Sequence, residues 1–587
     1  MFIIFYMNIL FYVYIIYKYL NKYFINLMGE ENENSRSEYE ILKLNILENY
    51  NYDIDKSNEI KESNFKYQME YNGIKAESIF NQIQATMFNN QGNNNIIFSK
   101  VILDSFNMLL SELNNKQKKQ NKRIPKMQFQ KEINKKYNIF LDEIVSQYTN
   151  ENLNLYNNEL NTGPITIKHV KELSSYSLIP KDNKGNFEEY RNYFIEVRNE
   201  ILDELDINQN DPLLGKNKFI LVLIFDSTDT KPLLNEIIGY DPLNDYNKYQ
   251  LKFYDNENNT FDSYYFMSGQ IMYLEGNLIN DNTVLEVQKF SYGYNNNHFK
   301  IDINFVSSFY QNNNGIYTIY TMNGPYYTKE KIDLNPFFSL LMTLSEKSPH
   351  CVIINGPFIY SENELIQSGN LGEYSTYLDL FKNIMYNISH IFSKKNTKIL
   401  IAPSLSDELN YYPLPQPSFN KIIKNLHYDN IEFIPNPHIM QINEILFANI
   451  NYDIIAEINQ NTIRSNNNSP IDSSLQMLFY QRSLFPVLSN TIYINDSEKM
   501  DKVLSYDITQ EKFFKMDDIP DIVIINSGMT SFVKNIFNSL VINTGGLVKG
   551  KNFGNISKIS VYNPSRTENI LQRTKVEIIK VNGNRYE

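Results

Sequence analysis

Residues 316–525 alternate short apolar runs with amphipathic segments of helical periodicity, and this alternation limits the fold more than any other feature of the chain. Strands that alternate with helices bury a mostly parallel or mixed sheet between helical layers. We therefore predict an α/β domain over residues 311–587. Its predicted strands are 316–322, 351–354, 398–402, 431–434 and 521–525, with a β-rich region at 445–458, and its predicted helices are 335–346, 374–394 and 472–480.

Residues 191–310 follow a different pattern, in which one amphipathic helix at 192–207 precedes a series of short apolar runs. Short strands at close intervals, with Gly, Asn and Asp between them, are typical of a small Greek-key barrel. We therefore predict a helix followed by a barrel of the OB type. The predicted strands of this barrel are 219–225, 249–254, 271–276, 283–290 and 299–306.

The first 190 residues divide into three predicted segments. Residues 36–112 have apolar side chains at helical spacing, so we expect a small helical domain over residues 28–115. Residues 116–190 are interpreted as a basic, Asn-rich linker, whose Lys/Arg-rich start is either a nuclear import signal, an anion-binding arm or a solvated flexible stretch. We interpret residues 1–27 as a hydrophobic extension that the gene model adds upstream of a start at Met28. The alternative is a signal anchor, although the apolar run 2–17 falls short of the ~20 residues that a spanning helix needs.

The composition excludes several classes of protein. A lone Cys351 cannot form a disulfide scaffold, a Cys-based zinc site or an iron–sulfur cluster within the chain, and its place at the start of a predicted strand suits a small buried apolar residue. With 55 Lys and Arg against 67 Asp and Glu, the net charge is −12, which argues against a protein whose main role is to coat a phosphate backbone. In the barrel region, acidic residues likewise outnumber Lys, so we expect a barrel that packs against protein.

The loops after the first three α/β strands are where such a sheet binds its ligands. A two-metal phosphoesterase needs Asp and His in these loops to hold its cations. These loops instead carry mostly Gly, Pro, Ser and Leu, so we predict no catalytic residue, no metal and no cofactor. The loops are interpreted as a degenerate former metal site made of Asn323, Gly324, Pro325, Tyr326, Gly356, Pro357, Phe358, Ser404 and Asp407.

His438 is the one histidine whose position after a predicted strand suits a metal ligand. The sequence offers it no partner motif, because His169 falls outside the predicted α/β domain. We therefore expect a structural or surface role for His438. The alternative is an active, divergent metallophosphoesterase with a site built around Asp407, Glu408 and His438.

Seven segments, in order along the chain, resemble the B-subunit family of replicative DNA polymerases. They extend over about 220–560. The family's Asn-Pro-Gly-Arg reads Asn543-Thr544-Gly545-Gly546 here, so a contact made by that Arg has no counterpart. The matching residues are Ser268–Gly276, Gly324-Pro325-Tyr326, Gly356-Pro357-Phe358, Ala402–Asp407 with Pro415-Gln416-Pro417, Gln481-Arg482-Ser483 with Pro486, Pro520–Ile525, and Phe532-Val533-Lys534 with the Gly-x-Leu-x-Lys-Gly that ends at Gly550.

The resemblance implies a non-catalytic accessory subunit of a nuclear polymerase–primase complex. In this family the barrel and an inactive phosphoesterase-like domain pack together and hold the zinc-bearing C-terminal domain of the catalytic subunit, which links it to primase. The implied partners are therefore the polymerase alpha catalytic subunit and the primase subunits, with other replisome proteins reached through the N-terminal region, DNA contacted indirectly, and no membrane. The Gly-Pro-Tyr loop and the Gln-Arg-Ser segment favour the alpha branch, and the delta and epsilon branches are the alternatives.

Overall fold

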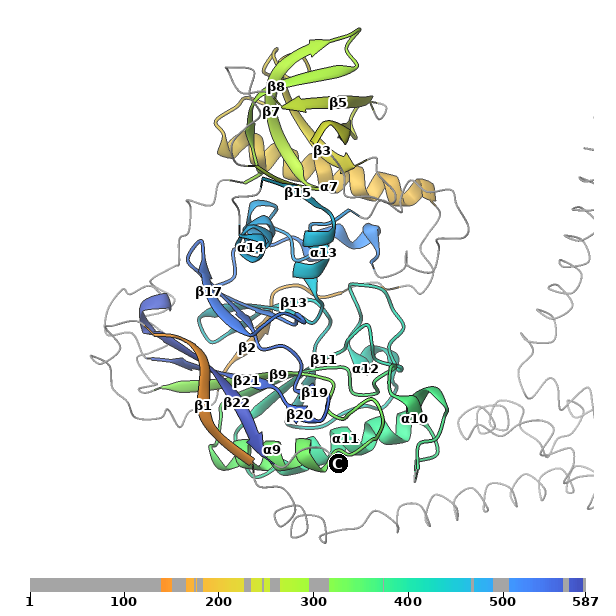
Figure 1. Cartoon of the computed structure of the whole chain (residues 1–587), viewed down its shortest axis with the longest axis vertical. Coiled ribbons are helices and arrows are strands. Elements are labelled where there is room, and N and C mark those ends of the chain that lie inside the picture. The colour runs from red at the N-terminus through yellow and green to blue at the C-terminus, as the bar shows by residue number, and fades with distance from the viewer. Residues whose placement is uncertain are drawn as a thin grey trace, which may run out of the picture. The chain divides into compact units, whose positions relative to one another are not determined.

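The structure is a computed structural model of the chain, shown in Figure 1. It describes residues 139–149, 165–173, 176, 183–225, 234–244, 247–253, 264–294, 316–372, 374–465, 469–488, 506–562 and 570–583, all of which lie in the unit 131–587. The predicted extension 1–27, the predicted helical domain 28–115 and the predicted strand 299–306 lie outside these residues. Within them, no helix is long and apolar enough to cross a membrane.

A seven-stranded sheet forms one half of the α/β domain. The four successive strands at one side of the sheet are parallel to one another, as the alternation of strands and helices predicts, and the other three strands join antiparallel. Helices α9 (Asn335–Glu346) and α11 (Tyr377–Ile391) cover its outer face. The strand order is β1 (Ile139–Tyr148), β22 (Thr574–Gly583), β21 (Asn555–Val561), β9 (Tyr317–Asn323), β10 (Cys351–Asn355), β11 (Lys398–Ala402) and β12 (Ile431–Phe433).

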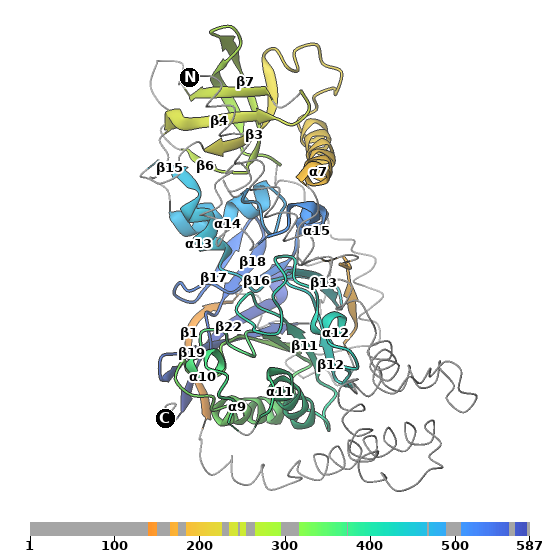
Figure 2. The same cartoon turned by 90° about the vertical axis from the view of Figure 1, so that its right-hand side faces the viewer.

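A six-stranded mixed sheet forms the other half. Its outer face carries α13 (Ile454–Gln460) and α14 (Pro470–Tyr480), and its inner face packs on the inner face of the first sheet through one shared apolar core. Figure 2 shows the resulting helix–sheet–sheet–helix layers, which we call the sandwich. The strand order is β17 (Phe532–Ile536), β18 (Ser539–Asn543), β16 (Ile522–Ile525), β14 (Ile445–Ile450), β13 (His438–Ile442) and β2 (Ile167–His169).

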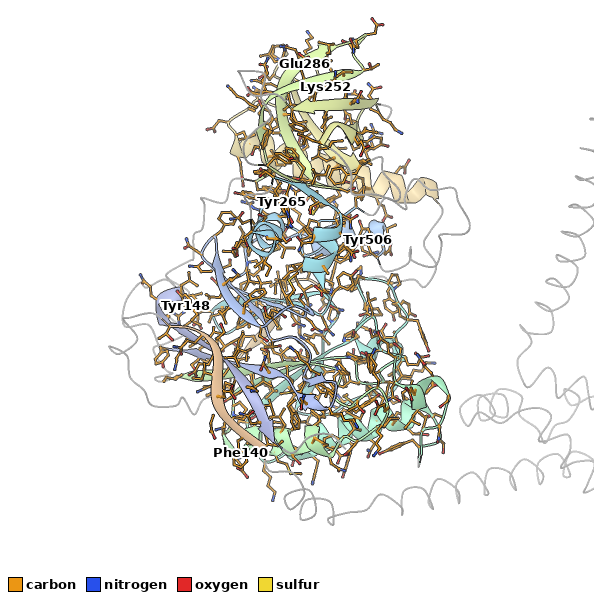
Figure 3. The ribbon with its side chains drawn as sticks, in the orientation of Figure 1. Phe140, Tyr148, Lys252, Tyr265, Glu286 and Tyr506 are labelled. Carbon is orange, nitrogen blue, oxygen red and sulfur yellow. The ribbon has the colours of Figure 1, made fainter. Side chains whose placement is uncertain are left out.

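Two strands of the sandwich come from the segment that the sequence predicted as a linker. β1 pairs with β22, and β2 pairs with β13, so the linker prediction for 116–190 is wrong at these strands. β1 lies at a sheet edge and exposes Phe140, Ile144 and Val145, as Figure 3 shows for Phe140. Because its apolar residues do not alternate between a buried and an exposed face, the periodicity that identifies a strand is absent.

The predicted β-rich region 445–458 is correct only for its first half. β14 ends at Ile450, and α13 begins after Asp453, whose Oδ1 accepts a hydrogen bond from the Ala456 backbone N–H at 3.1 Å. A carboxylate in this capping position satisfies a backbone donor that the first turn of a helix leaves free. The capping residue therefore favours a helix at this point, although the apolar residues that follow it are β-branched isoleucines.

The predicted barrel is present as five strands that close on themselves. The strands are β3 (Lys218–Phe225), β4 (Ile237–Asp241), β5 (Asn247–Phe253), β8 (Val284–Ser291) and β7 (Ile271–Ile279), in that spatial order. The sequence prediction missed β4, which is only five residues long and contains Gly239. Helix α7 (Asn183–Glu204) packs on the barrel through its predicted apolar face, which includes the buried Phe194, Val197 and Ile201.

The barrel and the sandwich are joined by a short two-stranded sheet. β6 (Tyr265–Met267) belongs to the barrel segment and pairs antiparallel with β15 (Thr462–Arg464), which follows α13 in the sandwich. The hydroxyl groups of Tyr265 and Ser474 are hydrogen-bonded at 2.8 Å, so β6 also contacts α14 (Figure 3). This sheet anchors the barrel beside the helices of the six-stranded half.

Candidate functional site

The carboxyl ends of the central strands converge on a group of buried side-chain amides. Asn323 ends β9 and Asn355 ends β10, while Asn449 lies on β14 of the other sheet. The Asn355 Nδ2 donates to Asn323 Oδ1 at 2.8 Å and to Asn449 Oδ1 at 2.9 Å, and the Asn449 Nδ2 donates back to Asn355 Oδ1 at 2.8 Å. The Asn323 Nδ2 completes the row by donating to Thr544 Oγ1 at 2.9 Å.

Three further buried amides continue this row beneath the loops. The Asn451 Nδ2 donates to the carbonyl oxygens of Gly356, at 3.1 Å, and Pro403, at 2.8 Å. The Asn436 Nδ2 donates to Gln416 Oε1 at 3.0 Å, and the Gln416 Nε2 donates to the Ser404 carbonyl at 3.1 Å. The group thus ties the loops after β10 and β11 to the six-stranded sheet. We call these residues the amide cluster: Asn323, Asn355, Asn449, Asn451, Asn436 and Gln416.

The amide cluster gives this edge of the sandwich a neutral, hydrogen-bonded interior. A pair of catalytic divalent cations is held by carboxylate and imidazole ligands. The amide cluster instead offers carboxamides, and each of the donors described above has a partner. Within the described part of the chain, no group of three or more His, Cys, Asp or Glu side chains could hold a metal ion.

Asp407 is the one carboxylate of the predicted former site that is buried beneath these loops. Its Oδ1 accepts from the backbone N–H of Phe358 at 2.5 Å and of Ile359 at 3.0 Å, and its Oδ2 accepts from the Ser404 N–H at 2.9 Å. Burial raises the pKa of Asp407 to about 7, and the three backbone donors act in the opposite direction. A Cβ on Gly356 would overlap Oδ2, which explains the glycine at this position. Asp407 therefore anchors two loops.

The aromatic residues of the two Gly-Pro loops point into the core of the seven-stranded half. Tyr326 stacks on Phe337 of α9, with ring centroids 4.2 Å apart, and its hydroxyl donates to the Asn355 carbonyl at 2.5 Å. Phe358 is fully buried and lies 5.4 Å from the Tyr326 ring. The peptide bonds before Pro325 and Pro357 are both cis. The Gly-Pro-aromatic sequence thus turns each loop inward over the strand that it follows.

His438 has a partner that the sequence prediction did not give it. Its Nε2 lies 2.7 Å from Nδ1 of His169, and Nε2 of His169 lies 2.5 Å from Oε1 of Glu432. His169 therefore belongs to the sandwich, through β2, and its predicted place outside this domain is wrong. Burial lowers the pKa of His438 to about 3. The hydrogen bond to Glu432 raises the pKa of His169, and the hydrogen bond from His169 lowers that of Glu432.

The three residues of the alternative metal site make separate contacts. Asp407 accepts from backbone donors and His438 contacts His169, as described above. Glu408 accepts at Oε1 from the hydroxyl of the exposed Tyr411 at 2.5 Å. The contacts of these residues therefore do not support the metal centre that this alternative requires.

The Gln-Arg-Ser segment lies elsewhere, where the sandwich meets the barrel. Gln481 pairs with the backbone of Ile271 in β7: its Oε1 accepts from the Ile271 N–H at 2.8 Å and its Nε2 donates to the Ile271 carbonyl at 3.2 Å. Ser483 is buried, and its Oγ accepts from the Phe485 N–H at 3.1 Å. Pro486 and Leu488 line a water-sized cavity at this contact, and a Cβ on Gly269 would overlap the Leu488 backbone.

Ion pairs between α7 and the sandwich surround this contact. Arg482 Nη2 lies 2.6 Å from Oε1 of Glu204, and its guanidinium lies 4.3 Å from the centre of the Tyr294 ring. Lys515, whose side chain is only 5% exposed, lies 2.6 Å from a carboxylate oxygen of both Glu196 and Glu200. The acidic face of α7 therefore holds the helix on the sandwich through these ion pairs. The sequence shows the acidic residues of this face but not their basic partners.

Of the amide cluster, the sequence analysis included Asn323 in the predicted former site and did not assign a site role to the other members. Asn makes up a large share of the chain, and a biased coding sequence is enough to explain this abundance. A usable signal was nevertheless present, because Asn323 and Asn355 each end a strand that the structure places in the interior of a sheet. Polar residues at the ends of central strands lie together at one edge of the sandwich.

Comparison with known proteins defines the class. A family model that describes the B subunit of DNA polymerases alpha and epsilon matches residues 319–534, which contain the amide cluster and the Gln-Arg-Ser segment. This match and the curated relatives described next confirm the resemblance to the B-subunit family of replicative DNA polymerases that was found in the sequence.

Curated relatives narrow the similarity to one branch of this family. The B subunit of DNA polymerase alpha from Schizosaccharomyces pombe is 26% identical over 284 residues, which are 46% of this chain and 48% of the relative. The protein of the same name in Dictyostelium discoideum is 33% identical over 168 residues, which are 28% of this chain and 26% of the relative. The one in Saccharomyces cerevisiae is 26% identical over 279 residues, which are 41% of this chain and 39% of the relative. The chain thus spans about half the length of these relatives, or less.

Proposed function

We propose that the chain is the non-catalytic accessory (B) subunit of a nuclear DNA polymerase alpha–primase complex, and that it scaffolds the catalytic subunit and primase for primer synthesis. The observation that carries this proposal is the amide cluster. It occupies the edge where a two-metal phosphoesterase needs charged ligands, and its members bond to one another and to the surrounding loops. The similarity to the B subunits of DNA polymerase alpha supports the choice of complex.

The architecture supports the finer fold assignment that we also propose. In the barrel, β3, β4 and β5 form an antiparallel meander, β5 and β8 are parallel, and β7 closes the barrel against β3. This arrangement fits an OB-type Greek-key barrel. The helix–sheet–sheet–helix layers, together with the former site at the carboxyl ends, suit an inactivated phosphoesterase-like domain.

The proposed partners follow from the family. We assign the zinc-bearing C-terminal domain of the polymerase alpha catalytic subunit and the primase subunits as direct or linked partners. Other replisome proteins would bind through the N-terminal region, and DNA would be contacted indirectly. The ion pairs that the buried Lys515 makes with α7, together with the β6–β15 sheet, hold the barrel and its helix on the sandwich, which suits a rigid scaffold.

Affinity purification tests the proposal. The tagged full chain is isolated from nuclear extract in moderate salt, and the bound proteins are identified by mass spectrometry. We expect the polymerase alpha catalytic subunit and both primase subunits. Recovery of a delta or epsilon catalytic subunit instead, or of the chain alone, would contradict it.

A metal assay tests the non-catalytic part separately. The purified chain is incubated with Mn²⁺ or Zn²⁺ and a chromogenic phosphodiester. We expect turnover no faster than with the metal ion alone. Turnover that His438→Ala abolishes would show an active metallophosphoesterase and overturn this part of the proposal.

A further inference from the structure

A short segment that begins at Ile165 fastens the chain to the edge of the six-stranded sheet before α7 begins. We call residues 165–171 the β2 strap. The Thr166 N–H donates to Asn443 Oδ1 at 2.9 Å, and the Val170 N–H donates to the Ile439 carbonyl at 3.1 Å. Between these bonds lies β2, which pairs with three residues of β13. A pairing of three residues at a sheet edge gains little stability from its backbone hydrogen bonds alone. The side chains of the strap therefore determine how firmly it is held.

Two side chains of the strap make polar contacts with the sandwich. Lys171 donates to the Lys515 carbonyl at 2.7 Å and lies 3.0 Å from Oδ2 of Asp517. His169 lies between Glu432, at 2.5 Å, and His438, at 2.7 Å. Glu432 comes from β12, an edge strand of the seven-stranded sheet, whereas His438 comes from β13 of the six-stranded sheet. His169 therefore links the strap to both sheets at once.

The proton on His169 determines the strength of this link. A protonated imidazole donates at both ring nitrogens, and a neutral imidazole donates at only one. The protonated ring therefore donates to Glu432 and to His438 together, and its bond to the carboxylate is charge-assisted. His438 is 1% exposed, and when it accepts from the protonated His169 its own Nδ1 carries the hydrogen; that buried Nδ1 has no hydrogen-bond partner among the described residues. When His169 loses its proton, the charge on Glu432 loses its counter-charge.

We propose that Glu432, His169 and His438 form a proton-controlled clasp that holds the β2 strap on the sandwich when His169 is protonated and loosens when it is not. The charged and titratable groups around His169 are Glu432 on β12, His438 on β13 and Glu172 directly after the strap. Lys398 on β11 acts on Glu432 and partly offsets its charge. The contacts of Lys171 do not depend on this proton, so the strap stays tethered at its far end while the clasp opens.

The direction of the pH dependence follows from linkage. The pKa of His169 is raised in the folded clasp, chiefly by the hydrogen bond to Glu432. The stabilisation is therefore complete below the ordinary histidine pKa of about 6.5 and is lost as the pH rises through the higher folded value. The strap should be held more firmly at pH 6 than at pH 9.

Hydrogen exchange measured by mass spectrometry on the full chain tests the clasp. Exchange rates of peptides covering 165–171 are corrected for the intrinsic pH dependence of amide exchange and compared at pH 6 and pH 9. We expect protection of the strap to be lower at pH 9 than at pH 6, because the charge-assisted hydrogen bond to Glu432 is lost with the proton on His169. Peptides from β16, in the centre of the sheet, serve as the internal reference and should not change. Strap protection that is equal at the two pH values would overturn the proposal.

Two variants separate the clasp from a merely structural contact. Glu432→Gln keeps a hydrogen-bond acceptor but removes the charge, so the pH dependence of strap protection should disappear. His427→Gln is the matched control, because His427 is exposed and its ion pair among the described residues is with the exposed Asp429, at 3.5 Å. It should keep the full pH dependence. A pH dependence that persists in Glu432→Gln would show that another group controls the strap.

A histidine titration gives a second measurement that does not depend on the folding of the Glu432 variant. In the wild-type chain with ¹³C-labelled histidine, the signal of His169 is identified by its loss in His169→Gln. We expect His169 to titrate above pH 6.5 and His438 to remain neutral down to pH 5. Titration of His169 below pH 6.5 would contradict the clasp.

Discussion

Asn355 and Asn449 exchange two side-chain hydrogen bonds, 2.9 and 2.8 Å long, between a strand of one sheet and a strand of the other. Both residues are fully buried. This reciprocal amide pair joins the two sheets of the sandwich at the edge that contains the carboxyl ends of β9 and β10. A neutral pair can be buried without a counter-ion, which a carboxylate in the same place could not.

Asn355→Asp should destabilise the chain because it places a carboxylate opposite the oxygens of Asn323 and Asn449. The variant loses two donated hydrogen bonds and buries an unpaired charge, for an expected loss of about 3–5 kcal/mol in the free energy of unfolding. Urea unfolding followed by circular dichroism measures this loss. The matched control is Asn370→Asp at an exposed loop position, which should change stability by less than ~0.5 kcal/mol. Equal stability of the two variants would show that the amide cluster is not structural.

Asp407→Ala should release the loops after β10 and β11. It leaves the backbone donors of Phe358, Ile359 and Ser404 buried without their acceptor, at an expected cost of about 2–4 kcal/mol. Chemical unfolding measures the cost, and hydrogen exchange should show faster exchange at these three amides. Asp429→Ala, at a fully exposed position, is the control and should behave as the wild type does. A variant as stable as this control would refute the role of Asp407 as an anchor.

Gln481→Ala should loosen the barrel from the sandwich. The substitution removes both hydrogen bonds to Ile271 and the one that Gln481 donates to the Tyr292 carbonyl. We expect a loss of about 2 kcal/mol, with faster hydrogen exchange at the start of β7. Gln460→Ala, at the exposed end of α13, is the comparison and should leave β7 unchanged. Unaltered exchange of β7 in the Gln481 variant would place the barrel contact elsewhere.

Glu511→Gln should flatten the pH dependence of stability. Glu511 is buried beside Tyr506, which donates to its carboxylate, and burial raises the pKa of Glu511 to about 8. Because the folded chain holds this proton more tightly than the unfolded chain, the carboxyl stabilises the fold below about pH 4.5, and this stabilisation is lost as the pH rises to 8. Unfolding measured between pH 5 and pH 9 should show a smaller decline in the variant. An identical decline would assign the pH dependence to other groups.

The sequence predicted the elements whose pattern is local. The helix at 335–346 and the strand at 398–402 have the predicted bounds, because each is a continuous apolar or amphipathic run. The structure differs where pairing with a distant segment makes the element. β2 is three residues long and exists because β13 lies beside it, so no periodicity marks it.

In the candidate site, too, the sequence predicted the local features and missed the contacts with distant segments. The Gly-Pro-aromatic loops and Asp407 were found from the sequence, because strand ends can be located along the chain. The partners Asn449 and His169 were missed, since Asn449 lies on the other sheet, 94 residues after Asn355, and His169 lies on a strand that pairs with β13, 269 residues before His438. The packing of the two sheets brings Asn449 to Asn355, and the pairing of β2 with β13 brings His169 to His438.

The most direct test of the central claim is the stoichiometry of the complex that the full chain forms in cells. The complex purified through the tagged chain is analysed by native mass spectrometry together with quantitative peptide counting. The account predicts one copy each of this chain, the polymerase alpha catalytic subunit and the two primase subunits. A chain recovered alone, or with a different polymerase catalytic subunit and no primase, would contradict it.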